Sequence, residues 1–503
     1  MVPTLDPYTT LGVAPNATTE DIKAAYRRIA KRLHSDKNPH PGATAQMQAA
    51  TEAYDLLLDR KKRREYDEMR SRLSTEDDYI FTFRVTPSKR NIAALPESQV
   101  IYLLAEIFPD ERAREEEQEE RVANVNLTLV LDRSSSMRGQ RLERVKVAAH
   151  QIIDQLGEDD ILSIITFSDK AEVIVPATRV TDKPALKARV SMMIASGATA
   201  IYQGLEAGYE EVKKFYGPKL VNHIILLTDG KTYGDEEQCL ELAEKAGHEG
   251  VGISAMGLGS DWNDIFLDRI ASLTGGASEY IQSSSAVVEF LNNYVRNLSQ
   301  AFAERMRLSI APDPDIQLEL IFKLAPHPQP AEIHDGYIQL GSLQAKRPIV
   351  VLLQLQLPAN MPLGFRSIAR LVADGDILQN ARQSYQVVSD ISLEITDRPV
   401  TEEPPKSILN ALSKLTLYRL QQRAQEALAT GNFAEATKHF KNLATRFLEH
   451  GHEDLAQQAY TAALQISQTQ ALSADGQKSL KYGTRSLLLG PGSMSTVFLN
   501  EET

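Results

Sequence analysis

Three polar elements of the sequence carry oxygen ligands beside apolar runs. Asp132, Ser134 and Ser136 form an Asp-x-Ser-x-Ser loop at the end of the apolar run NLTLVLD. Thr199 lies in the segment SGATAIYQGL, and Asp229 follows the apolar run HIILLT. Because the carboxyl ends of parallel strands meet at one edge of a sheet, we expect these side chains to converge there. Hydroxyl and carboxylate oxygens suit a hard cation, Mg²⁺ above all, with Mn²⁺ or Ca²⁺ as alternatives.

The expected chemistry of this site is binding rather than catalysis. Two carboxylates neutralise a divalent charge, and Mg²⁺ usually keeps waters that another ligand can replace. The sequence therefore predicts a protein ligand that donates an Asp or Glu carboxylate to the metal. The chain has no Gly-x-x-x-x-Gly-Lys loop and no His-Glu-x-x-His motif, so we expect no enzyme.

Several further side chains lie near this loop in the sequence. Arg133, Arg138 and Arg141 could attract an acidic ligand, although solvated arginines at the start of a helix are the simpler interpretation. Tyr202 and Trp262 could line the rim of the site, although packing is the simpler interpretation for both.

A second constellation surrounds His34 and Asp36, which lie in a polar loop between two stretches of helical periodicity. The helix before this loop buries one apolar face and presents cations elsewhere. Thr19 is its candidate N-cap, with Glu20 and Asp21 in the first turn. On its own, such a basic face is typical of a solvated helix, but beside His34 and Asp36 it becomes a candidate surface for a partner. The cations expected on it are Lys23, Arg27, Arg28, Lys31 and Arg32.

The remaining patterns predict the elements that hold these residues. Apolar strands alternating with helices predict an α/β domain with a mostly parallel sheet. Strand-like runs before and after it predict a β-sandwich that shares strands from both sides. The charged run 110–121 is expected to be a solvated linker. The predicted divisions are 1–72 helical, 78–109 first sandwich strands, 122–300 α/β domain, 301–398 remaining sandwich, 405–490 helical domain and 491–503 tail.

The N-terminal segment resembles a J-domain, the module that activates DnaK-type chaperones. The residues that carry the resemblance are DPYTTLGV, the basic second helix, His34-x-Asp36, EAYDLLLD and KKRREYD. The resemblance implies that His34, Asp36, Lys23, Arg27, Arg28 and Lys31 bind a DnaK-type chaperone. Ser35 replaces the family's proline in the loop, and serine lacks the fixed φ of proline. Whether this loop still stimulates a chaperone stays open.

The α/β region resembles a von Willebrand factor type A domain with a metal-ion-dependent adhesion site. Asp132, Ser134, Ser136, Thr199 and Asp229 match the ligand positions of that family. The predicted fold is therefore multidomain α+β. An N-terminal helical J-domain precedes a Rossmann-like α/β von Willebrand A domain, which is inserted in a β-sandwich and followed by a C-terminal helical bundle.

Composition narrows the function classes further. The chain has 503 residues, with 42% hydrophobic and 24% charged, which is typical of several globular domains. Its formal net charge of −12 argues against a nucleic-acid partner. No apolar run approaches the ~20 residues of a membrane span, so no membrane partner is expected. One cysteine, Cys239, excludes internal disulfides and fits the cytoplasm.

Together these patterns predict a co-chaperone adaptor that captures an acidic group through its metal site and recruits a DnaK-type chaperone. The alternative is a Mg²⁺-dependent self-assembling structural protein, in which the J-like module is only a docking element. In that case Glu501 or Glu502 of the tail could fill the metal site of the next copy.

Overall fold

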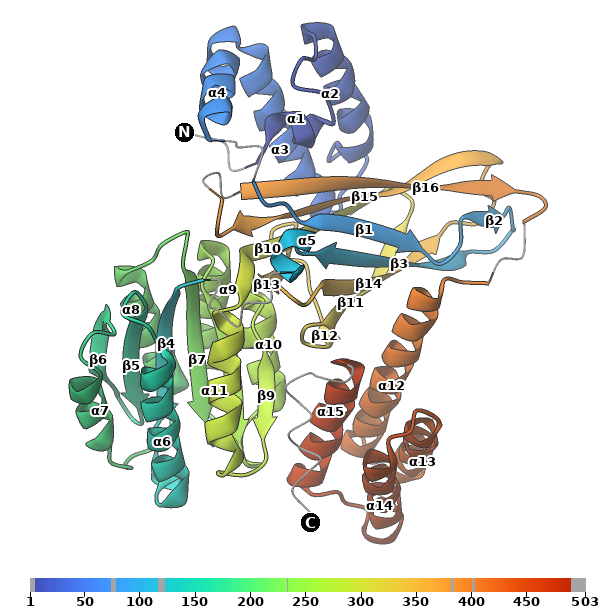
Figure 1. Cartoon of the computed structure of the whole chain (residues 1–503). Coiled ribbons are helices and arrows are strands. Elements are labelled where there is room, and N and C mark those ends of the chain that lie inside the picture. The colour runs from blue at the N-terminus through green and yellow to red at the C-terminus, as the bar shows by residue number, and fades with distance from the viewer. Residues whose placement is uncertain are drawn as a thin grey trace. The chain divides into compact units, whose positions relative to one another are not determined.

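The computed structural model describes residues 5–73, 78–115, 123–232, 234–380, 384–399 and 403–489. The chain divides into two units (Figure 1). The first comprises Met1–Ala123, Gln300–Pro326 and Pro330–Leu409, and the second comprises Asn124–Ser299, His327–Gln329 and Asn410–Thr503. The fold class expected from the sequence is confirmed, including the insertion of the α/β domain between sandwich strands. The tail glutamates Glu501 and Glu502 lie outside the described residues.

The first unit begins with a four-helix J-domain. Its second helix has a capping box between Thr18 and Asp21, so the N-cap is Thr18 and not Thr19 as expected. The second and third helices pack against each other, with the rings of Tyr26 and Tyr54 stacked at a centroid distance of 4.2 Å. The helices are α1 (Pro7–Leu11), α2 (Thr19–Leu33), α3 (Pro41–Leu58) and α4 (Arg60–Leu73).

Two five-stranded sheets form the sandwich of the first unit. Their orders are β1-β3-β14-β11-β12 and β13-β10-β15-β16-β2, so strands from before and after the α/β domain share both sheets, as predicted. Apolar residues between the sheets form one core. The strands are β1 (Thr82–Pro87), β2 (Asn91–Ala93), β3 (Gln99–Phe108), β10 (Ala301–Pro312), β11 (Gln317–Ala325), β12 (Gln329–Pro330), β13 (Ile338–Gln344), β14 (Ile349–Leu357), β15 (Gly364–Ile377) and β16 (Ser384–Thr396).

The charged run after β3 is not wholly a solvated linker. It begins with a short helix, α5 (Glu111–Glu115), in which Ala113 is buried in the sandwich core. The Asp110 carboxylate accepts hydrogen bonds from the Ile80 amide and the Arg112 guanidinium, which lowers the pKa of Asp110 to about 2. This part of the linker prediction is therefore wrong, because one alanine suffices to dock a single helical turn. Residues 116–121 lie outside the described ranges.

The second unit contains the predicted α/β domain, whose six-stranded sheet has the order β6-β5-β4-β7-β8-β9. All neighbours are parallel except β5 and β6, and β6 lies at one edge. The strands are β4 (Val125–Asp132), β5 (Ile161–Phe167), β6 (Ala171–Arg179), β7 (Val221–Thr228), β8 (Gly252–Leu258) and β9 (Ser278–Ile281). The helices are η1 (Ser135–Met137), α6 (Gln140–Gln155), α7 (Lys183–Ser191), α8 (Ile201–Lys214), α9 (Glu236–Glu249), α10 (Asp264–Thr274) and α11 (Ala286–Leu298).

Four C-terminal helices follow, and the last of them is docked on the α/β domain. They are α12 (Lys406–Ala429), α13 (Phe433–Glu449), α14 (Glu453–Thr469) and α15 (Ala474–Leu489). Tyr482 of α15 belongs to the core cluster of the α/β domain, where its ring lies 5.8 Å from that of Trp262. In the same domain, α15 contacts the edge strand β9.

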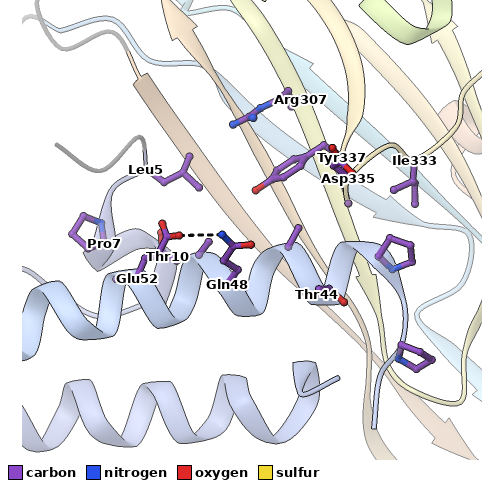
Figure 2. Close-up of a pocket in the computed structure, with 16 residues that line it drawn as sticks. Leu5, Pro7, Thr10, Thr44, Gln48, Glu52, Arg307, Ile333, Asp335 and Tyr337 are labelled. Carbon is purple, nitrogen blue, oxygen red and sulfur yellow. Dashed lines mark hydrogen bonds between the residues drawn. The ribbon is translucent and has the colours of Figure 1, made fainter. Parts of the chain in front are cut away.

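The J-domain is docked on the sandwich within the first unit. Its core cluster includes Ala311 of β10. The Asn38 amide donates to the Pro312 carbonyl at 2.8 Å, and a side chain at Gly42 would lie 1.9 Å from the Ile310 carbonyl oxygen. A cleft of about 870 Å³ lies where α3 faces the turn that carries Tyr337, and its lining residues are drawn in Figure 2.

Among the described helices, none combines the length and the apolar character that a membrane crossing requires.

Candidate functional site

Asp132 ends β4 and is fully buried at the carboxyl edge of the sheet. One carboxylate oxygen accepts a hydrogen bond from the Ser134 amide, and the other accepts from the Thr228 hydroxyl, each at 2.7 Å. Burial, helped by the nearby charge of Asp229, raises the pKa of Asp132 to about 6 in spite of these hydrogen bonds. A carboxylate held in this way carries a charge that a bound cation would stabilise.

The two serines of the loop connect Asp132 to Asp229. The hydroxyl oxygens of Ser134 and Ser136 are 2.9 Å apart, and the Ser136 hydroxyl donates to Asp229 Oδ1 at 2.7 Å. Asp229 directly follows β7, the strand beside β4, and its side chain is buried. The structure therefore brings these four predicted residues into one continuous network.

Thr199 reaches the same edge from the loop before α8. A methyl group added to Gly230 would lie 3.3 Å from the Thr199 hydroxyl, so Thr199 lies against the residue that follows Asp229. The loop is fixed to the Asp-x-Ser-x-Ser segment by backbone hydrogen bonds from Ser196 N–H to the Arg133 carbonyl (2.7 Å) and from Ser135 N–H to the Gly197 carbonyl (3.0 Å).

This set of donors fits a hard divalent cation. It offers two carboxylates and three hydroxyls, the oxygen ligands that Mg²⁺, Mn²⁺ and Ca²⁺ take in proteins. The buried carboxylate of Asp132 fits this assignment, and so do the serine hydroxyls, which bond to each other and to Asp229. Asp132, Ser134, Ser136, Thr199 and Asp229 would hold the ion.

Sequence reasoning underestimated Arg141. Its guanidinium lies 2.5 Å from Asp229 Oδ2, so it balances a charge of the candidate metal site instead of pointing to solvent. Arg138 is exposed, as the simpler interpretation expected, whereas Arg133 donates to the Ser196 hydroxyl at 2.8 Å. Its position in the first turn of α6, close to the Asp-x-Ser-x-Ser loop, indicated that Arg141 could reach the site. The sequence does not show in which direction the side chain points. Trp262 is buried, as expected.

The second candidate surface is the loop between α2 and α3. His34 caps α2 and accepts a hydrogen bond from the Asp36 amide at its Nδ1 atom (3.2 Å). The Asp36 carboxylate lies 3.6 Å from the same atom and its side chain is 83% exposed. The turn also includes bonds from the amides of Lys37 and Asn38 to the His34 carbonyl. Hydrogen bonds thus hold the backbone of the turn, while the exposed Asp36 carboxylate is available to a partner.

Four of the five cations expected on the basic face of α2 are exposed, and these are Lys23, Arg27, Arg28 and Lys31. The fifth, Arg32, was wrongly expected there. Its guanidinium lies 3.1 Å from Asp313 and 3.0 Å from Asp390, so it belongs to the contact between the J-domain and the sandwich. Among the described residues, the four exposed cations lie outside that contact.

Comparison with known proteins places these features in families. The DnaJ domain model matches residues 6–67, and the von Willebrand factor type A domain model matches residues 126–295. A third model, the Sll0103-like C-terminal alpha-helical domain, matches residues 406–490. The chain is therefore a J-domain protein that carries a von Willebrand factor A domain.

The particular family follows from a relative that matches more than half of the chain. The uncharacterized protein sll0103 of Synechocystis sp. is 31% identical over 319 residues, which cover 61% of this chain and 75% of that one. The chain belongs to the family of this protein. Chaperone protein DnaJ 2 of Corynebacterium efficiens is 48% identical over 71 residues, which cover 14% of this chain and only 18% of that one.

A solved structure supports the fold assignment independently. The von Willebrand factor type A protein from Catenulispora acidiphila matches with a TM-score of 0.67 and 15% identity, covering 82% of this chain and 98% of that chain. At this identity the likeness concerns the fold alone.

Proposed function

We propose that this protein is an adaptor that brings a DnaK-type chaperone to a protein held at a Mg²⁺ site. Both matched domains are interaction modules, and each presents a surface suited to one of the two partners. The observation that carries the proposal is the convergence of Asp132, Ser134, Ser136, Thr199 and Asp229 at one sheet edge, in a chain that also exposes Asp36 and a basic α2 face. Linking the two surfaces raises the local concentration of chaperone at the captured target.

The metal side of the proposal assigns a role to each group. Asp132 and Asp229 supply negative charge, while the hydroxyls of Ser134, Ser136 and Thr199 supply neutral oxygen ligands. A bound Mg²⁺, or Mn²⁺ or Ca²⁺ in its place, provides a coordination position for an Asp or Glu of the target. The Arg141 side chain is 38% exposed, so it has room to turn toward solvent. If it did so when a cation binds, Asp229 would balance the charge of the cation instead.

The chaperone side depends on exposed charge. Lys23, Arg27, Arg28 and Lys31 provide a positive face, and the Asp36 carboxylate offers an acceptor for an arginine of the chaperone. Ser35 leaves the loop without the stiffness of proline, yet the hydrogen bonds around His34 limit its freedom. The buried Cys239, whose thiol has a raised pKa, fits a reducing compartment such as the cytoplasm.

The test uses the full chain immobilised on beads and exposed to native cytosol, with Mg²⁺ or with a chelator. Wild type is compared with Asp229→Ala, Asp36→Asn and the control Asp159→Asn, which alters an exposed carboxylate of the same domain. We expect the target to be lost on chelation and in Asp229→Ala, and the chaperone to be lost only in Asp36→Asn. Capture of the target by Asp229→Ala in the presence of chelator would contradict the metal assignment.

The activity of the loop is measured separately, as stimulation of ATP hydrolysis by a DnaK-type chaperone. We expect stimulation by wild type, loss in Asp36→Asn and an increase in Ser35→Pro, since proline restores a fixed φ. If the chaperone hydrolysed ATP equally fast with wild type and with Asp36→Asn, the J-domain would serve only as a docking element.

A further inference from the structure

An open groove of about 610 Å³ lies beside the candidate metal site, between the edge strand β6 and α7. Its lining combines apolar side chains with two arginines. The residues that matter are Arg133, Glu172, Val173, Arg189, Met192 and Ile194.

The apolar part of the groove is exposed to an unusual degree. Met192 is 71% exposed, Ile194 is 73% exposed and Val173 is 37% exposed. They come from two elements, the strand β6 and the segment after α7, and they meet at one concavity. Clustered exposed apolar side chains with a polar rim are typical of a protein-binding surface.

The charged part of the groove favours an acidic ligand. Arg189 donates to the Ile174 carbonyl at 3.4 Å, which leaves its charge without a carboxylate among its hydrogen-bond partners in the described residues. Arg133 lies 3.7 Å from Glu172, whose side chain is 65% exposed. The lining thus holds two guanidinium groups and one exposed carboxylate, so its side chains carry a net positive charge.

The groove is continuous with the metal site. Arg133 lies between Asp132 and Ser134 in the sequence, and Ser196 of the groove donates its amide to the Arg133 carbonyl. The segment that carries Met192 and Ile194 leads directly to Thr199. A ligand of a few extended residues, at about 3.3 Å per residue, is long enough to occupy both places.

A segment of this chain has the matching chemistry. Residues 490–503 lie outside the described structure and contain Val497, Phe498 and Leu499, followed within two residues by Glu501 and Glu502. The segment thus holds apolar side chains and carboxylates within a few residues of each other, which is the combination that the groove and the metal site present. The segment follows α15, which is docked on the same α/β domain.

We propose that the groove and the metal site together bind this tail, with Phe498 and its neighbours on Met192 and Ile194 and with Glu501 or Glu502 at the metal. The proposal rests on the metal site of the proposed function and adds its regulation. A tail bound there excludes a target from the same position, within one chain or between two copies.

The test measures binding of a fluorescent peptide of residues 491–503 by anisotropy. The protein is the full chain with Phe498→Ser, Glu501→Gln and Glu502→Gln, so that its own tail does not compete. We expect binding in Mg²⁺, loss with chelator, and at least tenfold weaker binding when Met192→Ser and Ile194→Ser are added, since burial of each apolar side chain is lost. Leu448→Ser, at a 58% exposed leucine of α13, is the matched control and should bind normally.

Calorimetric titration of Mg²⁺ into the same variants separates this proposal from the proposed function. If Mg²⁺ does not bind the wild type, the metal site and the tail proposal fail together. If Mg²⁺ binds all variants equally but Met192→Ser and Ile194→Ser leave peptide binding unchanged, only the groove assignment is overturned. If the peptide does not bind, but another protein is captured and this capture is lost in Ile194→Ser, the groove belongs to that partner. The proposal that the tail occupies the groove is then overturned.

Discussion

Two helical modules are docked on sheet-containing domains in this protein, and different chemistry holds each of them. Apart from the ion pairs of Arg32 and the bond from Arg370 to the Thr10 carbonyl, the J-domain meets the sandwich largely through neutral groups. Asn38 donates to the Pro312 carbonyl, and Gln46 donates to the Ser309 hydroxyl and to the Arg370 carbonyl, both at 3.2 Å. At Gly42 the two backbones approach so closely that no side chain fits.

The contact of α15 with the α/β domain depends on buried charge instead. Arg485 makes a bidentate ion pair with Asp268 at 2.8 and 2.6 Å, and Lys481 pairs with both Asp264 and Asp268. Lys478 donates to the carbonyls of Ser260 and Trp262 at 2.6 Å, and its ammonium lies 4.1 Å from the centre of the Trp262 ring. The three cations are each less than 10% exposed.

The difference matters for function because each contact borders a candidate functional surface. Docking of the J-domain occupies Arg32 and leaves the rest of the basic α2 face free. Docking of α15 fixes the loop after β8, and a methyl group added to Gly259 in that loop would lie 3.4 Å from Arg141, the partner of Asp229. The stability of the J-domain contact should therefore depend on side-chain volume, and the stability of the α15 contact should depend on charge and pH.

The largest effect is expected for Asp268→Asn. This change keeps the shape of the side chain but leaves Lys481 and Arg485 without a shared carboxylate in a buried place, which costs about 3–5 kcal/mol. We therefore expect α15 to detach. Trp262 is the single tryptophan of the chain and is 1% exposed beneath Lys478, so its fluorescence should shift to the red. Asp159→Asn is the control, and an unshifted spectrum in Asp268→Asn would contradict the role of charge.

Gly42→Ala is the corresponding test of the neutral contact. The added methyl group meets the backbone of Ile310, which cannot move as a side-chain end can, so we expect the J-domain contact to weaken by about 1–3 kcal/mol. Hydrogen exchange should rise in peptides from β10 and from the start of α3, while Trp262 fluorescence stays constant. Gln48→Ala, at an exposed position of the same helix, should change neither measurement.

Local patterns explain what could be predicted from the sequence. The strands of the α/β domain, the J-domain helices and the Asp-x-Ser-x-Ser loop are each specified within a short window, by apolar periodicity or by ligand spacing. The topological rule that strand ends converge then correctly placed Asp132 and Asp229 together, although 96 residues separate Asp132 from its other partner Thr228.

What could not be predicted depends on tertiary pairing. Arg32 has the same local signal as Arg28, yet its partners Asp313 and Asp390 lie far along the chain. Arg485 and Asp268 are 217 residues apart, so no window on α15 shows that its cations are buried. Arg141 is a third case, since only the fold brings Asp229 within its reach.

Lowering the pH should release α15 from the α/β domain before the J-domain leaves the sandwich. The ion pairs with Arg485 and Lys481 hold the pKa of Asp268 well below its usual range. When α15 is released, Asp268 regains its ordinary pKa near 4 and takes up a proton as the pH falls through that value. Below it, the free energy that holds α15 on the domain falls by about 1.4 kcal/mol for each further pH unit. We expect Trp262 fluorescence to shift reversibly between pH 5 and pH 3, before exchange rises in β10. Simultaneous loss of both contacts would mean that Asp268 does not control the release of α15.

The smallest effect is expected from comparing Arg32→Ala with Arg28→Ala. This comparison tests which cations of α2 contact the sandwich and which remain available to a chaperone. Arg32 is 28% exposed and its partner Asp390 is 45% exposed, so its loss should weaken the contact with the sandwich by only about 0.5–1 kcal/mol. Arg28 faces solvent, so its loss should leave hydrogen exchange in β10 unchanged and lower the stimulation of a DnaK-type chaperone. Arg32→Ala should give the opposite pair of results. If both substitutions lowered stimulation equally with no change in exchange, Arg32 would belong to the chaperone-binding face, and the J-domain would have to leave the sandwich when it acts.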